Sequence, residues 1–276
     1  MKTHYTLFHA FGIPVTVDFS LLILLFMLVT SYKNLFVGLT AGAVLLASIL
    51  LHELGHSLVG RAFGCQVRDI RLMMLGGCAT MASMPRKAWQ EILMAFAGPL
   101  VSALIVIASV VLMDAVRIPN GLARWTLNYA FGLNAVLFLF NMLPAFPMDG
   151  GRILRATLQQ FFTTRLKATW IASRIGRFVA VLLGLSVPYS IITGTYSDFM
   201  LIRLLIAAMI YQTAQREYLM VLAEEQRARR NPFAGFPFFG QGFPPRTPPP
   251  DNTQAVVSPP PYQPRGSTRV DVHKEG

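Results

Sequence analysis

Six long apolar stretches, separated by short polar segments, set the pattern of this chain. They cover roughly Phe19–Thr30, Phe36–Val59, Ile92–Met113, Trp125–Leu143, Phe178–Thr193 and Phe199–Gln212. A helix of about 20 apolar residues crosses the roughly 30 Å hydrocarbon core of a bilayer. The second, third and fourth stretches reach that length, whereas the other three need flanking residues or a different tilt. We therefore predict an all-α polytopic membrane protein with about six transmembrane helices.

The basic residues alternate between the segments that connect these stretches. Two segments are rich in them, the one before the third stretch and the one before the fifth: Arg61, Arg68, Arg71, Arg86 and Lys87, then Arg152, Arg155, Arg165, Lys167, Arg174 and Arg177. The intervening segments hold only Lys33, Arg117 and Arg124. Since cytoplasmic loops carry an excess of Lys and Arg, we expect both rich segments and both termini on the cytoplasmic side of a cell inner membrane.

The character of the chain changes after residue 225. Between Pro232 and Pro264 lie 11 of its 18 prolines, with Gly, Gln, Ser and Thr between them. Such a segment cannot bury enough apolar surface to offset the entropy of ordering it. We predict a transmembrane domain over residues 1–225 and a disordered Pro-rich cytoplasmic tail over residues 226–276.

Composition agrees with a membrane protein and excludes two other classes. Of the 276 residues, 54% are hydrophobic and 13% charged, whereas a soluble domain carries about 25% charged residues. The net charge of +11 is spread between apolar stretches, so nucleic-acid binding is not expected. The two cysteines, Cys65 and Cys78, form neither a disulfide framework nor a Cys-x-x-Cys metal pair.

A zinc-binding pattern lies inside the second apolar stretch. His52 and His56 are four residues apart and share one face of a helix, so both imidazoles can reach one zinc ion. Glu53 stands beside them as a general base. Ionisable groups at membrane depth are costly and normally face a cavity or a partner. A buried hydrogen-bonded cluster of purely structural purpose is the alternative.

A catalytic zinc takes a third protein ligand and keeps one position open. The other histidines lie in the terminal regions: His4, His9 and His273. The third ligand is therefore expected to be a carboxylate, and four of these fall near the correct membrane face: Asp18, Asp69, Glu91 and Asp149.

Asp149 is the strongest of the four carboxylates. It follows the fourth stretch within residues 141–151, where two prolines and two glycines break the helix. An irregular backbone at membrane depth is tolerated where it lines a cavity or packs in protein. Glu91 instead suits the N-terminus of the third helix, where the helix dipole favours a carboxylate. Asp69, flanked by Arg68 and Arg71, is expected to be a solvated loop charge.

Two motifs together resemble the site-2 protease family of intramembrane zinc metalloproteases, peptidase family M50. They are His52-Glu53-Leu54-Gly55-His56 and the pattern Asn141-x-x-Pro144-x-x-x-x-Asp149-Gly150, and the similarity runs from about Phe11 to about Arg155. The resemblance implies that His52, His56 and Asp149 bind zinc and that Glu53 is the catalytic base. It also implies that the Asn141 amide lies near the site, where it could stabilise an oxyanion. Asn141 as a helix-ending turn residue is the alternative.

Residues 73–79 resemble the family's strand-like loop near the active site. Its Gly76 and Gly77 would lie at an edge that pairs with an extended substrate by β-augmentation, unless they form only a turn. The resemblance implies cleavage of a transmembrane protein that another protease has already cut. A surface metalloprotease with a glutamate ligand, a zinc transporter and an inactive scaffold are the competing classes.

Overall fold

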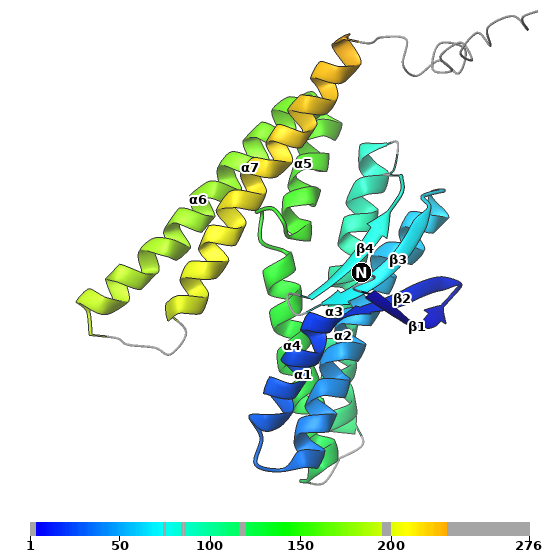
Figure 1. Cartoon of the computed structure of the whole chain (residues 1–276), viewed down its shortest axis with the longest axis vertical. Helices are drawn as coiled ribbons and strands as arrows, with labels where there is room; N and C mark the ends of the chain where they lie inside the picture. The colour runs from blue at the N-terminus through cyan, green and yellow to red at the C-terminus, as the bar shows by residue number, and fades with distance from the viewer. Residues whose placement is uncertain are drawn as a thin grey trace, which may run out of the picture. The chain divides into compact units, whose positions relative to one another are not determined.

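A computed structural model describes residues 4–73, 76–83, 85, 87–115, 120–194 and 200–230. The described elements follow one another as β1 (His4–Ala10), β2 (Ile13–Asp18), α1 (Phe19–Thr30), α2 (Leu35–Ala62), β3 (Val67–Met73), β4 (Gly76–Met81), α3 (Ala88–Ala115), α4 (Leu122–Asn141), α5 (Asp149–Phe161), α6 (Arg165–Ile192) and α7 (Met200–Arg230) (Figure 1). Met1–Arg229 forms one compact unit. The prediction of a helical membrane protein with a short strand-like loop is confirmed in part: the described residues are mostly helical, and the strands form a small sheet that is larger than the predicted loop.

The four strands form one sheet with the order β1-β2-β3-β4. β1 and β2 pair antiparallel, β2 and β3 parallel, and β3 and β4 antiparallel. The turn between β1 and β2 has positive φ at Phe11 and Gly12. Of the strand-like loop predicted over residues 73–79, residue 73 ends β3 and residues 76–79 belong to β4, whereas residues 74 and 75 lie outside the described residues. β1 and β2 were not predicted. They have seven and six residues, and a search for long continuous apolar stretches misses strands this short.

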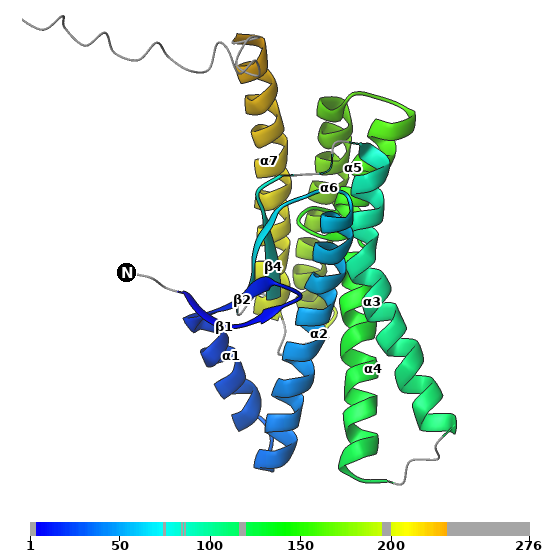
Figure 2. The same ribbon diagram turned by 90° about the vertical axis from the view of Figure 1, so that its right-hand side faces the viewer.

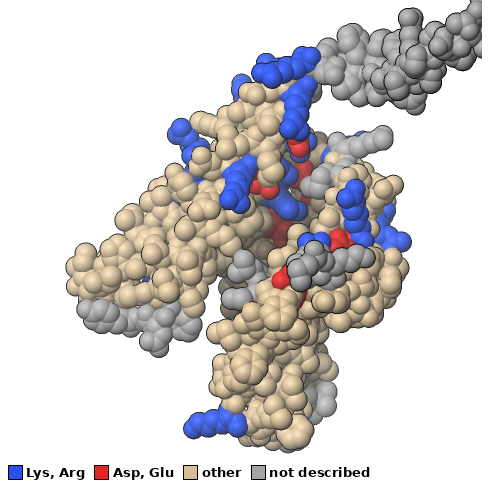
Figure 3. Space-filling view, in the orientation of Figure 1, with Lys and Arg blue, Asp and Glu red and all other residues tan. Residues whose placement is uncertain are grey.

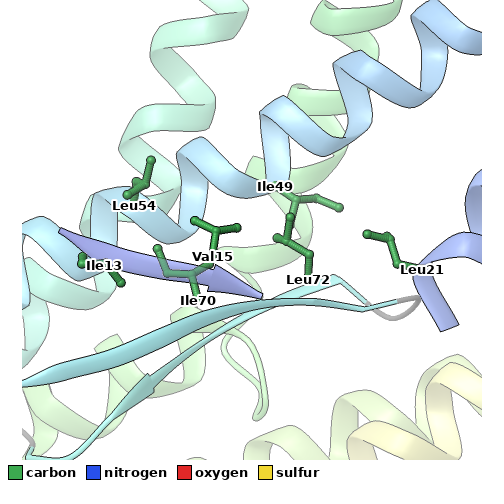
Figure 4. Packing of buried hydrophobic residues seen from close by; sticks show 7 residues of the cluster. All are labelled: Ile13, Val15, Leu21, Ile49, Leu54, Ile70 and Leu72. Carbon is green, nitrogen blue, oxygen red and sulfur yellow. The ribbon is translucent and has the colours of Figure 1, made fainter. Parts of the chain in front are cut away.

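One face of the sheet packs on α2. Ile13, Val15, Ile70 and Leu72 from the strands are buried against Leu21, Ile49 and Leu54 of the first two helices (Figure 4). β-branched residues at alternating strand positions present one apolar face in this way. The packing fixes the sheet beside the helix that carries the His-Glu-x-x-His motif, and Figure 2 shows β4 and α2 close together from a second direction.

The six predicted apolar stretches correspond to α1, α2, α3, α4, α6 and α7. Among the described residues, α2, α3 and α6 are long and apolar enough to cross a bilayer, each with 28 residues. The count of six spans therefore stays a prediction. Within the bundle, the buried Asn134 of α4 donates a hydrogen bond to Ser48 of α2 over 2.9 Å, so a polar contact joins two otherwise apolar helices.

The polar segment expected before the fifth stretch is largely helical. It contains α5, and α6 begins at Arg165 rather than at Phe178. α5 is amphipathic and rich in polar residues, so it gave no apolar stretch. α7 continues to Arg230, past both Gln212 and the predicted tail boundary. The predicted disorder of the tail stays a prediction, since residues 231–276 lie outside the described residues.

A buried ion pair fixes α5 between α3 and α7. The Arg155 guanidinium, 4% exposed, donates a hydrogen bond to Glu91 of α3 and lies 3.7 Å from Glu217 of α7. It also covers the ring of Phe146. Leaving one charge of such a pair unpaired costs about 3 to 5 kcal/mol. Arg155 is thus not the loop charge expected, and Glu91 has a cationic partner besides its place in the first turn of α3.

Candidate active site

The middle of α2 presents two histidines and a glutamate toward α3 and β4. His52 and His56 are one helical turn apart and both are buried. Glu53 lies beside them and is partly exposed. The sheet packs against α2. Residues of β4 and of the His-Glu-x-x-His motif therefore line the same cavity.

Asp149 reaches this space from the first turn of α5. The chain leaves α4 at Asn141, and Ala145 and Phe146 are fully buried in the segment that leads to α5. Asp149 Oδ2 lies 3.3 Å from His52 Nε2 and 3.1 Å from His56 Nε2, and the two Nε2 atoms are 3.2 Å apart. His52 and Asp149 are 97 positions apart in the sequence. The fold nevertheless brings the three ligand atoms of His52, His56 and Asp149 close enough together to bind one metal ion.

The hydrogen bonds of the two rings show that this point suits a cation. His56 Nδ1 faces the Met94 carbonyl oxygen at 2.8 Å, so it carries the hydrogen and leaves the Nε2 lone pair for a ligand bond. His52 Nδ1 lies 3.0 Å from the Ser102 hydroxyl, a contact that holds the ring in the same orientation. Two imidazole lone pairs and a carboxylate oxygen therefore converge where a cation relieves their repulsion.

The spacing of the three atoms also fits zinc. A tetrahedral site with ligand bonds of about 2.0 to 2.1 Å has edges of about 3.3 to 3.4 Å, close to the observed separations of 3.1 to 3.3 Å. Two histidines and one carboxylate form a known catalytic zinc set that leaves one position open.

Gly98 of α3 makes room for the two imidazoles. A Cβ at this position would overlap His56 Nε2 and would lie 2.7 Å from His52 Nε2. The tripeptide Ala97-Gly98-Pro99 predicts close packing in a membrane helix, yet nothing in the sequence shows that the neighbours are the metal-binding rings. Ser102 and the Met94 carbonyl likewise carry no motif, because their roles arise only when α3 lies against α2.

Glu53 is held by the edge strand of the sheet. The Ala79 backbone N–H of β4 donates to Glu53 Oε2 over 3.1 Å, and a Cβ at Gly77 would lie 3.0 Å from Glu53 Oε1. Gly77 therefore lets the strand approach the carboxylate. Gly76 precedes it at the start of β4, so both glycines belong to the edge strand of the sheet, and their predicted role in substrate binding stays a prediction.

These groups border a cavity of about 370 Å³. Its lining includes the residues already described and further residues from the helices, from β4 and from the segment before α5: Ile49, Met81, Ala95, Leu137, Phe140, Asn141, Pro147, Met148, Arg152 and Met209. Asn141, at the end of α4, donates to the Leu137 carbonyl oxygen over 3.0 Å, so one of its two amide hydrogens is engaged within its own helix. Its predicted catalytic role stays a prediction.

Cys78 also lines the cavity. Desolvation raises the pKa of its thiol, and the nearby Glu53 carboxylate raises it further. Among the described residues, the group whose ligand atoms converge consists of His52, His56 and Asp149 and does not include Cys78.

The other carboxylates considered from sequence have different partners. Asp18 caps α1 by accepting from the Ser20 N–H over 2.9 Å. Asp69 is a strand residue, not a loop residue, and pairs with Arg71 at 3.3 Å. With Glu91 bound to Arg155, the described residues bring only Asp149 to the two histidines.

The model of peptidase family M50 matches residues 40–120 and 115–183, more than half of the chain. The chain belongs to peptidase family M50. It is 33% identical over 228 residues to a zinc metalloprotease of Methanocaldococcus jannaschii, covering 81% of this chain and 63% of that protein. The chain thus spans less than two thirds of this relative's length.

A solved structure extends the similarity to the fold. The site-2 protease from Methanocaldococcus jannaschii is 30% identical, with a TM-score of 0.54 over 78% of this chain and 95% of that chain. The predicted family is confirmed, and zinc as its metal agrees with the zinc metalloprotease relative and with the His-His-Asp group.

A methyl group at Gly98 is expected to disturb the metal group. Gly98→Ala should lower the zinc content of the purified protein by tenfold or more at limiting zinc, because metal affinity is sensitive to how the ligands are oriented. Gly132→Ala in α4 is the matched control, since a Cβ there meets nothing within 4 Å. Equal zinc content in both variants, measured by elemental analysis, would refute the close approach of α3 to the rings.

Proposed function

We propose that this protein is an intramembrane zinc metalloprotease that hydrolyses peptide bonds within or next to transmembrane segments. The observation that carries the proposal is the convergence of His52, His56 and Asp149 beside Glu53 in one cavity. Membership of a peptidase family supports the reaction class. Within the described part of the chain, three helices are apolar enough to span a bilayer, and one of them carries the motif, which supports the location.

His52, His56 and Asp149 would hold the zinc. When bound, zinc would polarise the scissile carbonyl and acidify water for the attack. The chain's own residues prepare this chemistry: Ser102 and the Met94 carbonyl orient the two imidazoles, and the Arg155 contacts fix the helix that begins at Asp149.

Glu53 would act as the general base. Its carboxylate borders the cavity next to the three ligands, so it can take a proton from the attacking water and pass it to the leaving amine. The Ala79 N–H holds one carboxylate oxygen in place. Asn141 lines the same cavity and would donate its second amide hydrogen to the developing oxyanion.

The exposed edge of β4 would bind the substrate as an added strand. β4 is the last strand of the sheet, and the Ala79 N–H points toward Glu53 rather than toward β3. Backbone groups alternate in direction along a strand. The N–H and C=O of Gly77, two residues before Ala79, therefore point to the same side as the Ala79 N–H, away from β3. A substrate strand paired there would run past the three ligands.

The substrate would be a transmembrane protein that another protease has first shortened, as the family resemblance suggests. A transmembrane helix shields its peptide bonds with its own turns, so it must unwind locally before it can pair with β4. We also propose that the site lies near the cytoplasmic face of a cell inner membrane, with both termini cytoplasmic. This orientation rests on the alternating basic segments and can be tested by the accessibility of cysteines introduced at the termini.

Two substitutions separate the base from the metal ligands. Glu53→Gln should reduce cleavage of a model transmembrane substrate by at least a thousandfold while zinc stays bound, because the amide cannot accept the proton. Asp149→Ala should lose both cleavage and zinc. Asp114→Ala, at an exposed position near the other end of α3, is the control. If Glu53→Gln cleaves the substrate at the wild-type rate, Glu53 is not the general base. If Asp149→Ala retains its full zinc content, Asp149 is not a zinc ligand.

The same assay tests Asn141. Asn141→Ala is expected to lower kcat by about a hundredfold to a thousandfold with zinc content unchanged, the usual cost of removing one oxyanion donor. An unchanged kcat would leave Asn141 as a helix-ending residue only.

Strand pairing is tested by amide hydrogen exchange. Binding of a substrate peptide to the Glu53→Gln variant should slow exchange at Gly77, whose backbone faces the cavity. Exchange at Cys78, whose backbone faces β3 by the same alternation, should be slow with or without peptide and is the internal control. Unchanged exchange at Gly77 on saturation with peptide would contradict pairing at this edge.

A further inference from the structure

A stripe of side chains along α6 changes from aromatic and basic to apolar. Trp170, Arg174, Phe178, Val181 and Leu185 follow one another at spacings of three or four residues, so they share one side of the helix. From Phe178 to Ile192 the helix has no charged residue. The boundary between the basic and the apolar part therefore falls between Arg177 and Phe178. In a spanning helix, this is the level of the lipid headgroups.

A hollow of about 240 Å³ lies at this boundary. It is lined by Arg174, Arg177, Phe178 and Val181 of α6 and by Tyr211 of α7. The two helices are packed together along their length through residues such as Ala180 and Ile210. The hollow thus has basic groups at one end and apolar side chains at the other, with a phenol from the second helix.

The two arginines of the hollow lack anionic partners among the described residues. Other arginines of the unit are ion-paired, such as Arg155 with Glu91 and Arg165 with Glu224. Arg174 instead lies over the Trp170 ring, 4.7 Å from its centroid. Arg177 has a buried Nε atom without a hydrogen-bond partner. The same Nε atom lacks a hydrogen-bond partner in the ion-paired Arg71 and Arg155, so what distinguishes Arg174 and Arg177 is the missing anionic partner, which an anion in the hollow would supply.

The surface next to the hollow is apolar. Phe178, Val181, Leu182 and Leu185 are all exposed in the structure. Figure 3 shows Lys and Arg gathered over the end of the α6–α7 pair that is nearer α5, whereas most of the visible described surface toward the opposite end is uncharged. A ligand with a phosphate at one end and a hydrocarbon chain at the other would match both parts of this surface.

We infer that the hollow between α6 and α7 binds the headgroup of an anionic phospholipid. Arg174 and Arg177 donate to the phosphate, and guanidinium forks suit phosphate oxygens. Tyr211 and Trp170 lie at the headgroup level, where aromatic rings are enriched. The acyl chains extend along Phe178, Val181 and Leu185. This site is separate from the catalytic cavity and does not depend on proteolysis.

The test is the selective retention of an anionic lipid by the full chain. The protein is equilibrated in nanodiscs of equimolar phosphatidylglycerol and phosphatidylcholine, and lipids that stay bound after release are counted by native mass spectrometry. Arg174→Gln and Arg177→Gln should each lower the enrichment of phosphatidylglycerol about fivefold, the effect of one basic residue near an anionic surface. Arg177→Lys keeps the charge and should retain most of the enrichment.

Lys167→Gln is the matched control, because it removes one positive charge from an exposed position of the same helix outside the hollow. It should leave the enrichment unchanged, and thermal unfolding checks that every variant is folded. Equal enrichment in wild type and both arginine variants would overturn the proposal. Inorganic phosphate is added in a second arm, and full displacement of the lipid by phosphate would assign the hollow to a free anion instead.

Discussion

The repulsion among three lone-pair donors is the constraint on which the rest of the structure depends. His52 Nε2, His56 Nε2 and Asp149 Oδ2 lie 3.1 to 3.3 Å from one another in a buried site. Without a cation, this arrangement would place two imidazole lone pairs against a carboxylate oxygen at low dielectric. With zinc it becomes a set of ligand bonds, so the metal and the local fold stabilise one another.

The surrounding elements hold these three atoms in place from three directions. The sheet packs on α2 through Ile49 and Leu54 and brings the β4 edge to Glu53. α3 approaches closely at Gly98 and supplies Ser102 and the Met94 carbonyl. Arg155 fixes α5 against α3 and α7, which positions Asp149 at the first turn of α5. A catalytic group built in this way needs little rearrangement when substrate binds.

Much of the site could be predicted from the sequence because its chemistry is local. The spacing of His52 and His56 places both on one helix face, and the prolines and glycines before Asp149 mark an irregular segment at membrane depth. Gly98, Ser102 and the Arg155–Glu91 pair could not be predicted, since their roles depend on which helices come into contact. β1 and α5 were missed for a different reason: a short strand and a polar amphipathic helix leave no long continuous apolar stretch.

The zinc K-edge X-ray absorption spectrum of the purified, zinc-loaded protein tests the three-ligand account most directly. The account predicts one zinc per chain with nitrogen and oxygen ligands only, including the multiple-scattering signal of two imidazoles. Cys78 lines the same cavity, so a sulfur ligand is a concrete alternative that the spectrum distinguishes. A zinc–sulfur distance of about 2.3 Å, or a signal from fewer than two imidazoles, would contradict it.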